Sequence, residues 1–199
     1  INMKLLILST ILISQLFSQN VNEVKSNWSI YAGISSMSAS ADSYQYETVD
    51  PGRKVGLNFG VIRSVSMKLD VGVGYTQRGW TDSAYYVDLG VNVDEDWSLS
   101  GIDLFATYDL FEIGNGGSVW VGPSFAILTS MEGELKTSSG QTVSDETEID
   151  DNDISILIGA SIPFGGSGSN LSIGYQRSII EVDNFIFFNQ LFARVSFSL

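Results

Sequence analysis

The chain has 199 residues, of which 44% are hydrophobic, 12% aromatic and only 17% charged, and its formal net charge is −13. Charged residues are scarcer than the roughly 25% of an average soluble domain, and the apolar content is too high for a disordered chain. We therefore expect one folded and unusually uncharged domain. The sequence contains no cysteine and no histidine, which excludes disulfides and thiolate metal sites and removes the commonest general base and metal ligand.

Residues 1–18 have the form of a secretory signal peptide. Met3 and Lys4 give a short positive start, and the apolar run from Leu5 to Ser14 follows them. The run is too short to span a bilayer as a helix. Cleavage after Ser18 leaves residues 19–26 as a short periplasmic segment before a domain at 27–199. The alternative is a soluble amphipathic helix, which is less favoured because no polar face interrupts the run.

From Trp28 onward, apolar side chains recur at alternate positions, which places them on one face of an extended strand. Glycines, β-branched residues and aromatic residues dominate these stretches and disfavour helix. Only Arg177 interrupts the alternation. Eight stretches show the pattern: Trp28–Ile34, Val55–Val61, Met67–Tyr75, Ile102–Leu110, Val119–Ile127, Ile154–Ile162, Leu171–Ile179 and Leu191–Leu199.

The opposite face of the same stretches carries mostly small residues, such as Gly33, Gly72, Ser124 and Ser196. A water-exposed outer surface would instead carry many lysines and glutamates. An eight-stranded barrel has room inside for only a modest set of side chains, so the bulky apolar residues must face outward. That arrangement is stable only where the surrounding solvent is hydrocarbon. The sequence therefore predicts an all-β fold, an eight-stranded antiparallel transmembrane up-and-down β-barrel.

The connections between the stretches alternate in length. Short ones span 63–66, 111–117 and 163–170, whereas longer ones span 42–53, 79–96 and 130–153, with 181–189 of intermediate length. Outer-membrane barrels have short periplasmic turns and longer external loops, so both termini are expected in the periplasm. Pro123 falls within a predicted strand, where it cannot donate to the ladder, and we expect a β-bulge there.

The signal peptide, the eight alternating stretches and the terminal segment Phe192–Leu199 (FARVSFSL) resemble the small outer-membrane β-barrel family of PorT-like, OmpX-like and OmpW-like proteins. The resemblance covers nearly all of the mature chain and is specific for the fold, but it is weak for function. It implies location in the outer membrane of a Gram-negative cell envelope, with the last strand recognised by the barrel-assembly machinery. The family's last strand usually ends in an aromatic residue, whereas this chain ends in Leu199.

Several charged residues are expected to face the lumen among small neutral ones. Charges that leave water must pair, so the set predicts either a polar conduit or proton-coupled gate, or a salt-bridged plug, and we favour the plug. Large residues expected on the same face, Tyr31, Phe105, Trp120 and Phe192, strengthen the case for an occluded lumen. The predicted lumen network consists of Lys54, Lys68, Asp70, Asp103, Asp109 and Arg194.

The negative charge is concentrated in the long connections. Divalent cations such as calcium could relieve the repulsion between these carboxylates, although no spacing matches an EF-hand loop, and solvated loop charge is the favoured interpretation. Acidic loops without a basic patch argue against nucleic-acid binding. The possible cation-binding loop consists of Asp145, Glu146, Glu148, Asp150, Asp151 and Asp153.

Three functional hypotheses follow, and none needs a cofactor. The first is a monomeric outer-membrane protein in contact with lipid, with a structural or surface-interaction role. The second is a narrow porin-like channel for small or apolar solutes. The third is a soluble periplasmic carrier of the lipocalin type. Barrel enzymes of the outer membrane typically rely on histidine with serine or aspartate, so no enzyme is expected.

Overall fold

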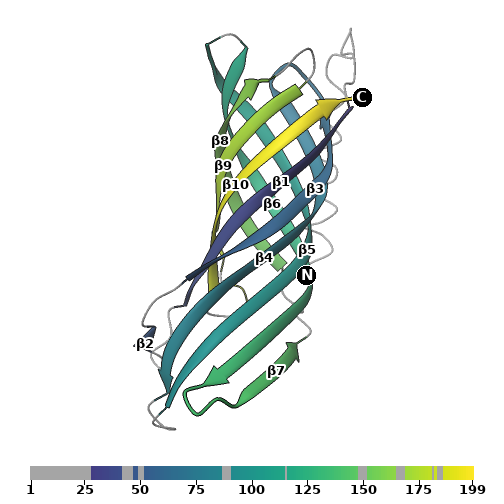
Figure 1. The fold of residues 1–199 in the computed structure, drawn as a ribbon. Coiled ribbons are helices and arrows are strands. Elements are labelled where there is room, and N and C mark those ends of the chain that lie inside the picture. Colours follow the sequence, from purple (N-terminus) through teal and green to yellow (C-terminus); the bar gives the residue numbers. More distant parts are fainter. Residues whose placement is uncertain are drawn as a thin grey trace, which may run out of the picture.

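The structure is a computed structural model that describes residues 28–41, 47–48, 52–86, 91–114, 116–147, 152–164, 169–180, 182 and 186–199. Eight antiparallel strands hydrogen-bond into a closed ring (Figure 1), which confirms the predicted up-and-down barrel. The proposed signal peptide and residues 19–26 lie outside the described residues. In order round the ring, the strands are β1 (Trp28–Ala41), β3 (Gly52–Ser64), β4 (Leu69–Tyr86), β5 (Val91–Ile113), β6 (Gly117–Thr137), β8 (Asn152–Pro163), β9 (Ser169–Ser178) and β10 (Ile186–Ser198).

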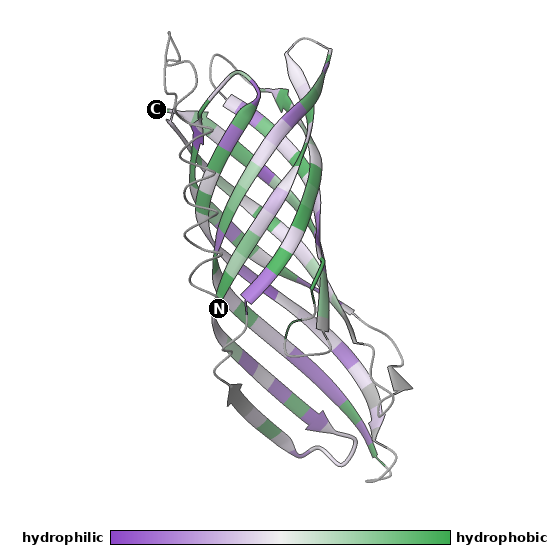
Figure 2. Ribbon diagram, turned by 180° about the vertical axis from the view of Figure 1, so that it is seen from behind, coloured by the Kyte–Doolittle hydropathy of each residue, from purple (hydrophilic) through white to green (hydrophobic). Residues whose placement is uncertain are grey.

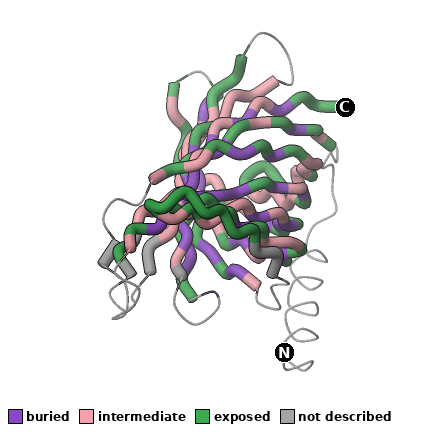
Figure 3. The backbone as a smooth tube through the Cα atoms, turned by 60° about the horizontal axis from the view of Figure 1, so that its bottom comes forward, coloured by how far each residue is buried: buried purple, intermediate pink, exposed green. Residues whose placement is uncertain are grey.

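Side chains alternate between the two faces of the ring, as the sequence predicts. Along β8, exposed Ile154, Ile156 and Ile158 alternate with buried Asp153, Ser155 and Leu157. Figure 3 shows this alternation of buried and exposed residues along the strands, and Figure 2 shows the matching alternation of hydrophobic and hydrophilic residues. We call the outward apolar surface the outer belt. It includes Ile30, Ile34, Val55, Leu57, Phe59, Ile102, Leu104, Ile127, Ile173 and Leu191.

Three neighbouring strands continue past one end of the ring and form a protruding sheet (Figure 1). We define this sheet as residues 81–86 of β4, 91–98 of β5 and 130–137 of β6, together with β7 (Thr142–Thr147), which pairs with β6. A two-residue strand, β2 (Glu47–Thr48), adds to the edge of β4.

The predicted connections 79–96 and 130–153 are therefore too long. The apolar alternation that defined the predicted strands stops before these residues, but backbone pairing continues, from Trp80 opposite Trp97 to Tyr86 opposite Val91. Backbone hydrogen bonds do not require apolar side chains, so pairing extends beyond the region that lipid would contact.

The opposite end of the ring carries short turns, as predicted. At the β5–β6 turn, Gly114 and Gly116 have φ angles of 55° and 86°, which a residue without a Cβ adopts at little cost. The C-terminal end of β10 lies at this end, where the Leu199 backbone N–H donates to the Trp28 carbonyl. We call the two ends the short-turn end and the long-strand end. None of the described residues belongs to a helix long and apolar enough to cross a membrane.

The bulge expected at Pro123 is absent. Pro123 pairs with Ile156 in regular register between β6 and β8, and the β5–β6 ladder keeps one register from Phe105 opposite Ser124 to Tyr108 opposite Val121. The sheet tolerates the loss of one backbone donor without inserting a residue. Register shifts occur elsewhere, between Arg53 and Asn58, between Ser100 and Gly101, and between Asp109 and Phe111.

Candidate functional site

The centre of the lumen contains an arginine held between two carboxylates. Arg78 of β4 donates from Nη1 to Asp153 Oδ2 of β8 at 2.8 Å, and from Nη2 to Asp103 Oδ1 of β5. All three side chains are buried: Arg78 is 3% exposed, Asp153 0% and Asp103 2%. Ser155 Oγ also donates to Asp153 Oδ2 at 2.7 Å. Burial makes each charge costly on its own, so the three groups depend on one another.

Other polar side chains surround this triad and form a polar layer. Among the described residues, nine buried side-chain atoms of the layer have no hydrogen-bond partner within the protein. Buried water is the usual partner of such atoms in a polar space. The residues that carry the nine atoms are Asn58, Thr76, Arg78, Ser124, Asp153, Gln176 and Gln190.

An aromatic cluster lies on the short-turn side of the polar layer. Its buried members are Tyr31, Phe105, Trp120, Leu157 and Phe192. Trp120 and Phe192 stack with ring centroids 6.1 Å apart, and Tyr31 meets Phe105 edge to face at 6.0 Å. The inward placement predicted for these four aromatic residues is confirmed.

Arg194 of β10 lies among the same rings. Its Cζ atom is 4.1 Å from the Phe192 centroid, 4.8 Å from that of Tyr31 and 5.2 Å from that of Phe105. Its Nε–H donates to Asn58 Oδ1 at 3.0 Å, and the residue is only 6% exposed. The three rings present their negative faces to the guanidinium and offset part of the cost of burying it.

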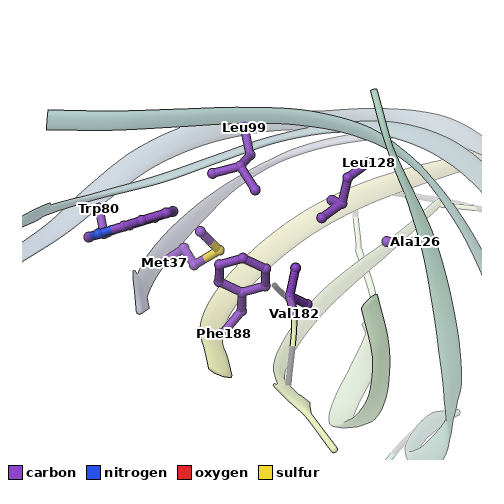
Figure 4. Packing of buried hydrophobic residues seen from close by; sticks show 7 residues of the cluster. All are labelled: Met37, Trp80, Leu99, Ala126, Leu128, Val182 and Phe188. Atoms are coloured by element: carbon purple, nitrogen blue, oxygen red, sulfur yellow. The ribbon is translucent and has the colours of Figure 1, made fainter. Parts of the chain in front are cut away.

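A second apolar cluster lies on the long-strand side of the polar layer (Figure 4). Gln190 falls between Phe188 of this cluster and Phe192 of the aromatic cluster along β10, so the polar layer separates the two. Along β5, Asp103 likewise falls between Leu99 and Phe105. The second cluster contains Met37, Trp80, Leu99, Ala126, Leu128, Val182 and Phe188.

The lumen opens at the short-turn end into a recess of about 300 Å³. Its walls carry seven serines and two carboxylates, Asp70 and Asp109, and Trp120 and Arg194 also line it. Trp120 Nε1–H donates to Ser161 Oγ at 2.8 Å, which fixes the indole ring against the wall.

The protruding sheet carries a second hollow, of about 540 Å³. Five acidic residues line it: Asp82, Asp94, Glu95, Asp96 and Glu134. Among the described residues, its lining includes one basic residue, Lys136, and Lys54 of β3 pairs with Asp96 at its border. The hollow is therefore strongly acidic.

The predicted lumen network is divided among these places. Asp103 and Arg194 belong to the lumen interior, whereas Asp70 and Asp109 line the recess. Lys54 is half-buried near the long-strand end, where it binds Asp96 and donates to Ser98 Oγ at 2.7 Å. The expectation for Lys68 needs correction: it is exposed in the turn before β4, because that strand begins only at Leu69.

The predicted cation-binding loop is not assembled as expected. Asp153 lies inside the ring on β8 and binds Arg78, so it is not a loop residue. Asp145 and Glu146 belong to β7, whereas Glu148, Asp150 and Asp151 lie outside the described residues. Among the residues that the structure describes, no three acidic side chains come close enough together to hold a metal ion.

Comparison with known proteins identifies the fold. No protein-family model matches the chain, and no curated protein matches it in sequence. The crystal structure of Neisserial surface protein A (NspA) matches it with a TM-score of 0.56 and 16% identity, over 86% of this chain and 97% of that one. The chain has the fold of a small outer-membrane β-barrel.

A second barrel of this kind is Ail, the attachment invasion locus protein of Yersinia pestis, which matches with a TM-score of 0.52 and 11% identity over 88% of this chain and 100% of that one. Ail in complex with the heparin analogue sucrose octasulfate matches with a TM-score of 0.52 and 16% identity, over the same shares of the two chains. At these identities the likeness concerns the fold of the barrel.

Sequence reasoning missed the two residues that join opposite walls of the barrel. Arg78 was overlooked because the apolar alternation of its strand ends at Tyr75, although Arg78 has the same inward parity as Thr76. Asp153 was grouped with the neighbouring acids of the loop, although it shares inward parity with Ser155 and Leu157. Arg78 is the next inward position after Thr76, and Asp153 is the one before Ser155, so one further inward position on each strand identifies both.

Proposed function

We propose that this chain is an integral outer-membrane protein with a closed lumen, no catalytic role, and a protruding sheet that binds cationic partners outside the cell. The observation that carries the proposal is the acidic hollow on the protruding sheet, which is rigidly connected to the barrel through β4, β5 and β6. Carboxylates gathered on one face attract positively charged surfaces and repel other anions.

The orientation in the membrane belongs to this proposal. Short turns and the chain termini face the periplasm in outer-membrane barrels, which directs the protruding sheet outward. The barrel functions as a monomer, and β10 is the strand that the barrel-assembly machinery recognises. The exposed apolar side chains of the outer belt support contact with lipid on every side of the ring.

The closed lumen is supported by the two apolar clusters. One stands on each side of the polar layer, and the layer itself is crossed by the Arg78 triad. A barrel of eight strands leaves little space that such side chains do not fill. The protein would then act through its surface and not as a channel.

A fluorescent oligolysine peptide tests the proposed surface. We expect salt-sensitive binding to the barrel in neutral detergent micelles, weakened about tenfold when Asp82→Asn, Asp94→Asn and Glu134→Gln are combined in the lining of the hollow. The matched control combines Asp70→Asn, Asp109→Asn and Glu112→Gln at the short-turn end, which removes the same charge and leaves the protruding sheet intact. Equal weakening in both triple variants would contradict the proposal.

Heparin provides the opposite probe. Ail is known in complex with a heparin analogue, whereas the hollow of this chain is acidic, so we expect no binding of heparin to it. Saturable heparin binding that the three substitutions in the protruding sheet strengthen would show that this surface recognises anions, and it would contradict the proposal.

A narrow channel is the alternative, and one observation favours it. Within the part of the chain that the structure describes, the polar layer contains nine buried atoms without a hydrogen-bond partner, a composition that suits a hydrated path. Conductance across a planar bilayer separates the two proposals. A closed lumen gives no conductance steps for the native chain, and none when Trp80→Ala and Phe188→Ala thin the second cluster alone, because the aromatic cluster and the Arg78 triad still block the lumen. Stepwise conductance of the native chain would support the channel.

A further inference from the structure

The recess at the short-turn end combines a cavity with charges of both signs at different depths. Its volume of about 300 Å³ is at the lower end of the range for small-molecule sites and accommodates a molecule the size of an amino acid. We propose that this recess binds a small zwitterion, whose carboxylate contacts Arg194 and whose ammonium group contacts Asp70 and Asp109. The inference is independent of the function proposed for the protruding sheet.

Arg194 provides the inner half of the site. Among the described residues, its guanidinium makes one hydrogen bond, from Nε–H to Asn58, and no ion pair. The terminal nitrogens therefore retain donors that no hydrogen bond among the described residues uses, and the residue lines the recess. Arg78 differs, because both of its terminal nitrogens already bind carboxylates. A guanidinium with free terminal donors matches a carboxylate through two parallel hydrogen bonds.

Asp70 and Asp109 provide the outer half. Asp70 is the second residue of β4, next to the turn that precedes the strand, and the Asp109 backbone N–H donates to the Lys68 carbonyl of that turn. Arg194 lies deeper, because it pairs with Gly33 of β1 and Ser172 of β9, several residues from the ends of those strands. Asp70 is therefore nearer to the opening than Arg194, and Asp109 lines the same recess.

This order of charges selects the ligand. A simple anion is repelled by the two carboxylates that share the recess with Arg194, and a simple cation bound by the carboxylates gains nothing from Arg194. A molecule with both charges places each one beside its opposite, where the low dielectric of the lumen strengthens the attraction. The aromatic rings around Arg194 form the floor of the recess and limit the ligand to a short side chain.

The test follows the arginine Nε–H signals of the full mature chain, folded in neutral micelles and labelled with nitrogen-15 arginine. L-alanine is titrated to about 50 mM, in parallel with N-acetyl-L-alanine, which lacks the ammonium group, and L-alaninamide, which lacks the carboxylate. We expect alanine to shift the Arg194 signal saturably and to leave Arg177, on the outside of β9, unchanged. Each single-charge analogue should bind at least about tenfold more weakly.

Arg194 is buried, so the barrel with Arg194→Gln could fail to fold. The variants that test the site are therefore made at Asp70 and Asp109. Asp70→Asn with Asp109→Asn should reduce alanine binding to the level of N-acetylalanine. The control Glu112→Gln removes a charge from an exposed position near the same end and should leave alanine binding unchanged. The proposal is overturned if alanine leaves the Arg194 signal unshifted, or if alaninamide binds as tightly as alanine.

Discussion

Arg78 of β4 and Asp153 of β8 are bound to each other at 2.8 Å although their strands share no hydrogen-bonded neighbour in the ring. The contact therefore spans the lumen from one wall to another, and Asp103 of β5 completes it from a third strand. Removing the arginine leaves two carboxylates in an environment that is nearly inaccessible to solvent.

Substitution of Arg78 by methionine should lower the free energy of unfolding by about 3–5 kcal/mol, because Asp103 and Asp153 lose their common counter-charge. Urea unfolding of the barrel in lipid vesicles measures the change. The control is Lys54→Met, which breaks the half-exposed pair with Asp96 and should cost at most about 1 kcal/mol. Similar losses in the two variants would show that the triad does not stabilise the barrel.

The aromatic cluster depends on glycines that face it. A Cβ atom on Gly72 would lie 2.2 Å from Phe105 Cζ, and that ring cannot move freely because Tyr31 packs against its edge. Gly72→Ala should therefore destabilise the barrel by about 1–3 kcal/mol. In a Phe105→Leu background the penalty should largely disappear, which a double-mutant cycle measures. An equal loss of stability in both backgrounds would show that the cost of Gly72→Ala does not come from a clash with the Phe105 ring.

The free-energy cost of placing a charged side chain on the outer belt should depend on how deep that position lies in the bilayer. Ile158 lies in the middle of β8 and faces outward, so Ile158→Arg should cost about 2–4 kcal/mol in vesicles. Thr129→Arg, beyond Ile127 where the belt ends on β6, should cost at most about 1 kcal/mol. The two variants are compared by the fraction that folds into vesicles. A tolerated arginine at 158 would mean that this surface does not contact hydrocarbon.

The eight strands of the ring could be predicted because hydrocarbon on one side and a narrow lumen on the other impose alternation on every residue between them. Ile154, Ile156 and Ile158 display that constraint directly. The protruding sheet could not be found in this way, because water on both faces accepts polar residues such as Asp94 and Glu95 at successive positions.

The site was predicted less completely for a related physical reason. The alternation of side chains along each strand identifies Asp103 and Arg194 as inward residues. It does not show which inward residues of different strands contact one another across the ring. Arg78 and Asp153 are 75 positions apart in the sequence and come together only when the barrel closes. That Asp70, Asp109 and Arg194 line one recess likewise depends on the stagger of their strands.

Gel mobility of the mature chain, with and without boiling, tests the central claim most directly. Samples are prepared in lipid vesicles and, separately, in buffer without detergent. A barrel with an apolar outer belt should fold only in lipid and give an unboiled band that shifts on heating. Folding in plain buffer, with no shift on heating, would contradict the outward placement of residues such as Leu57 and Ile156 in contact with lipid.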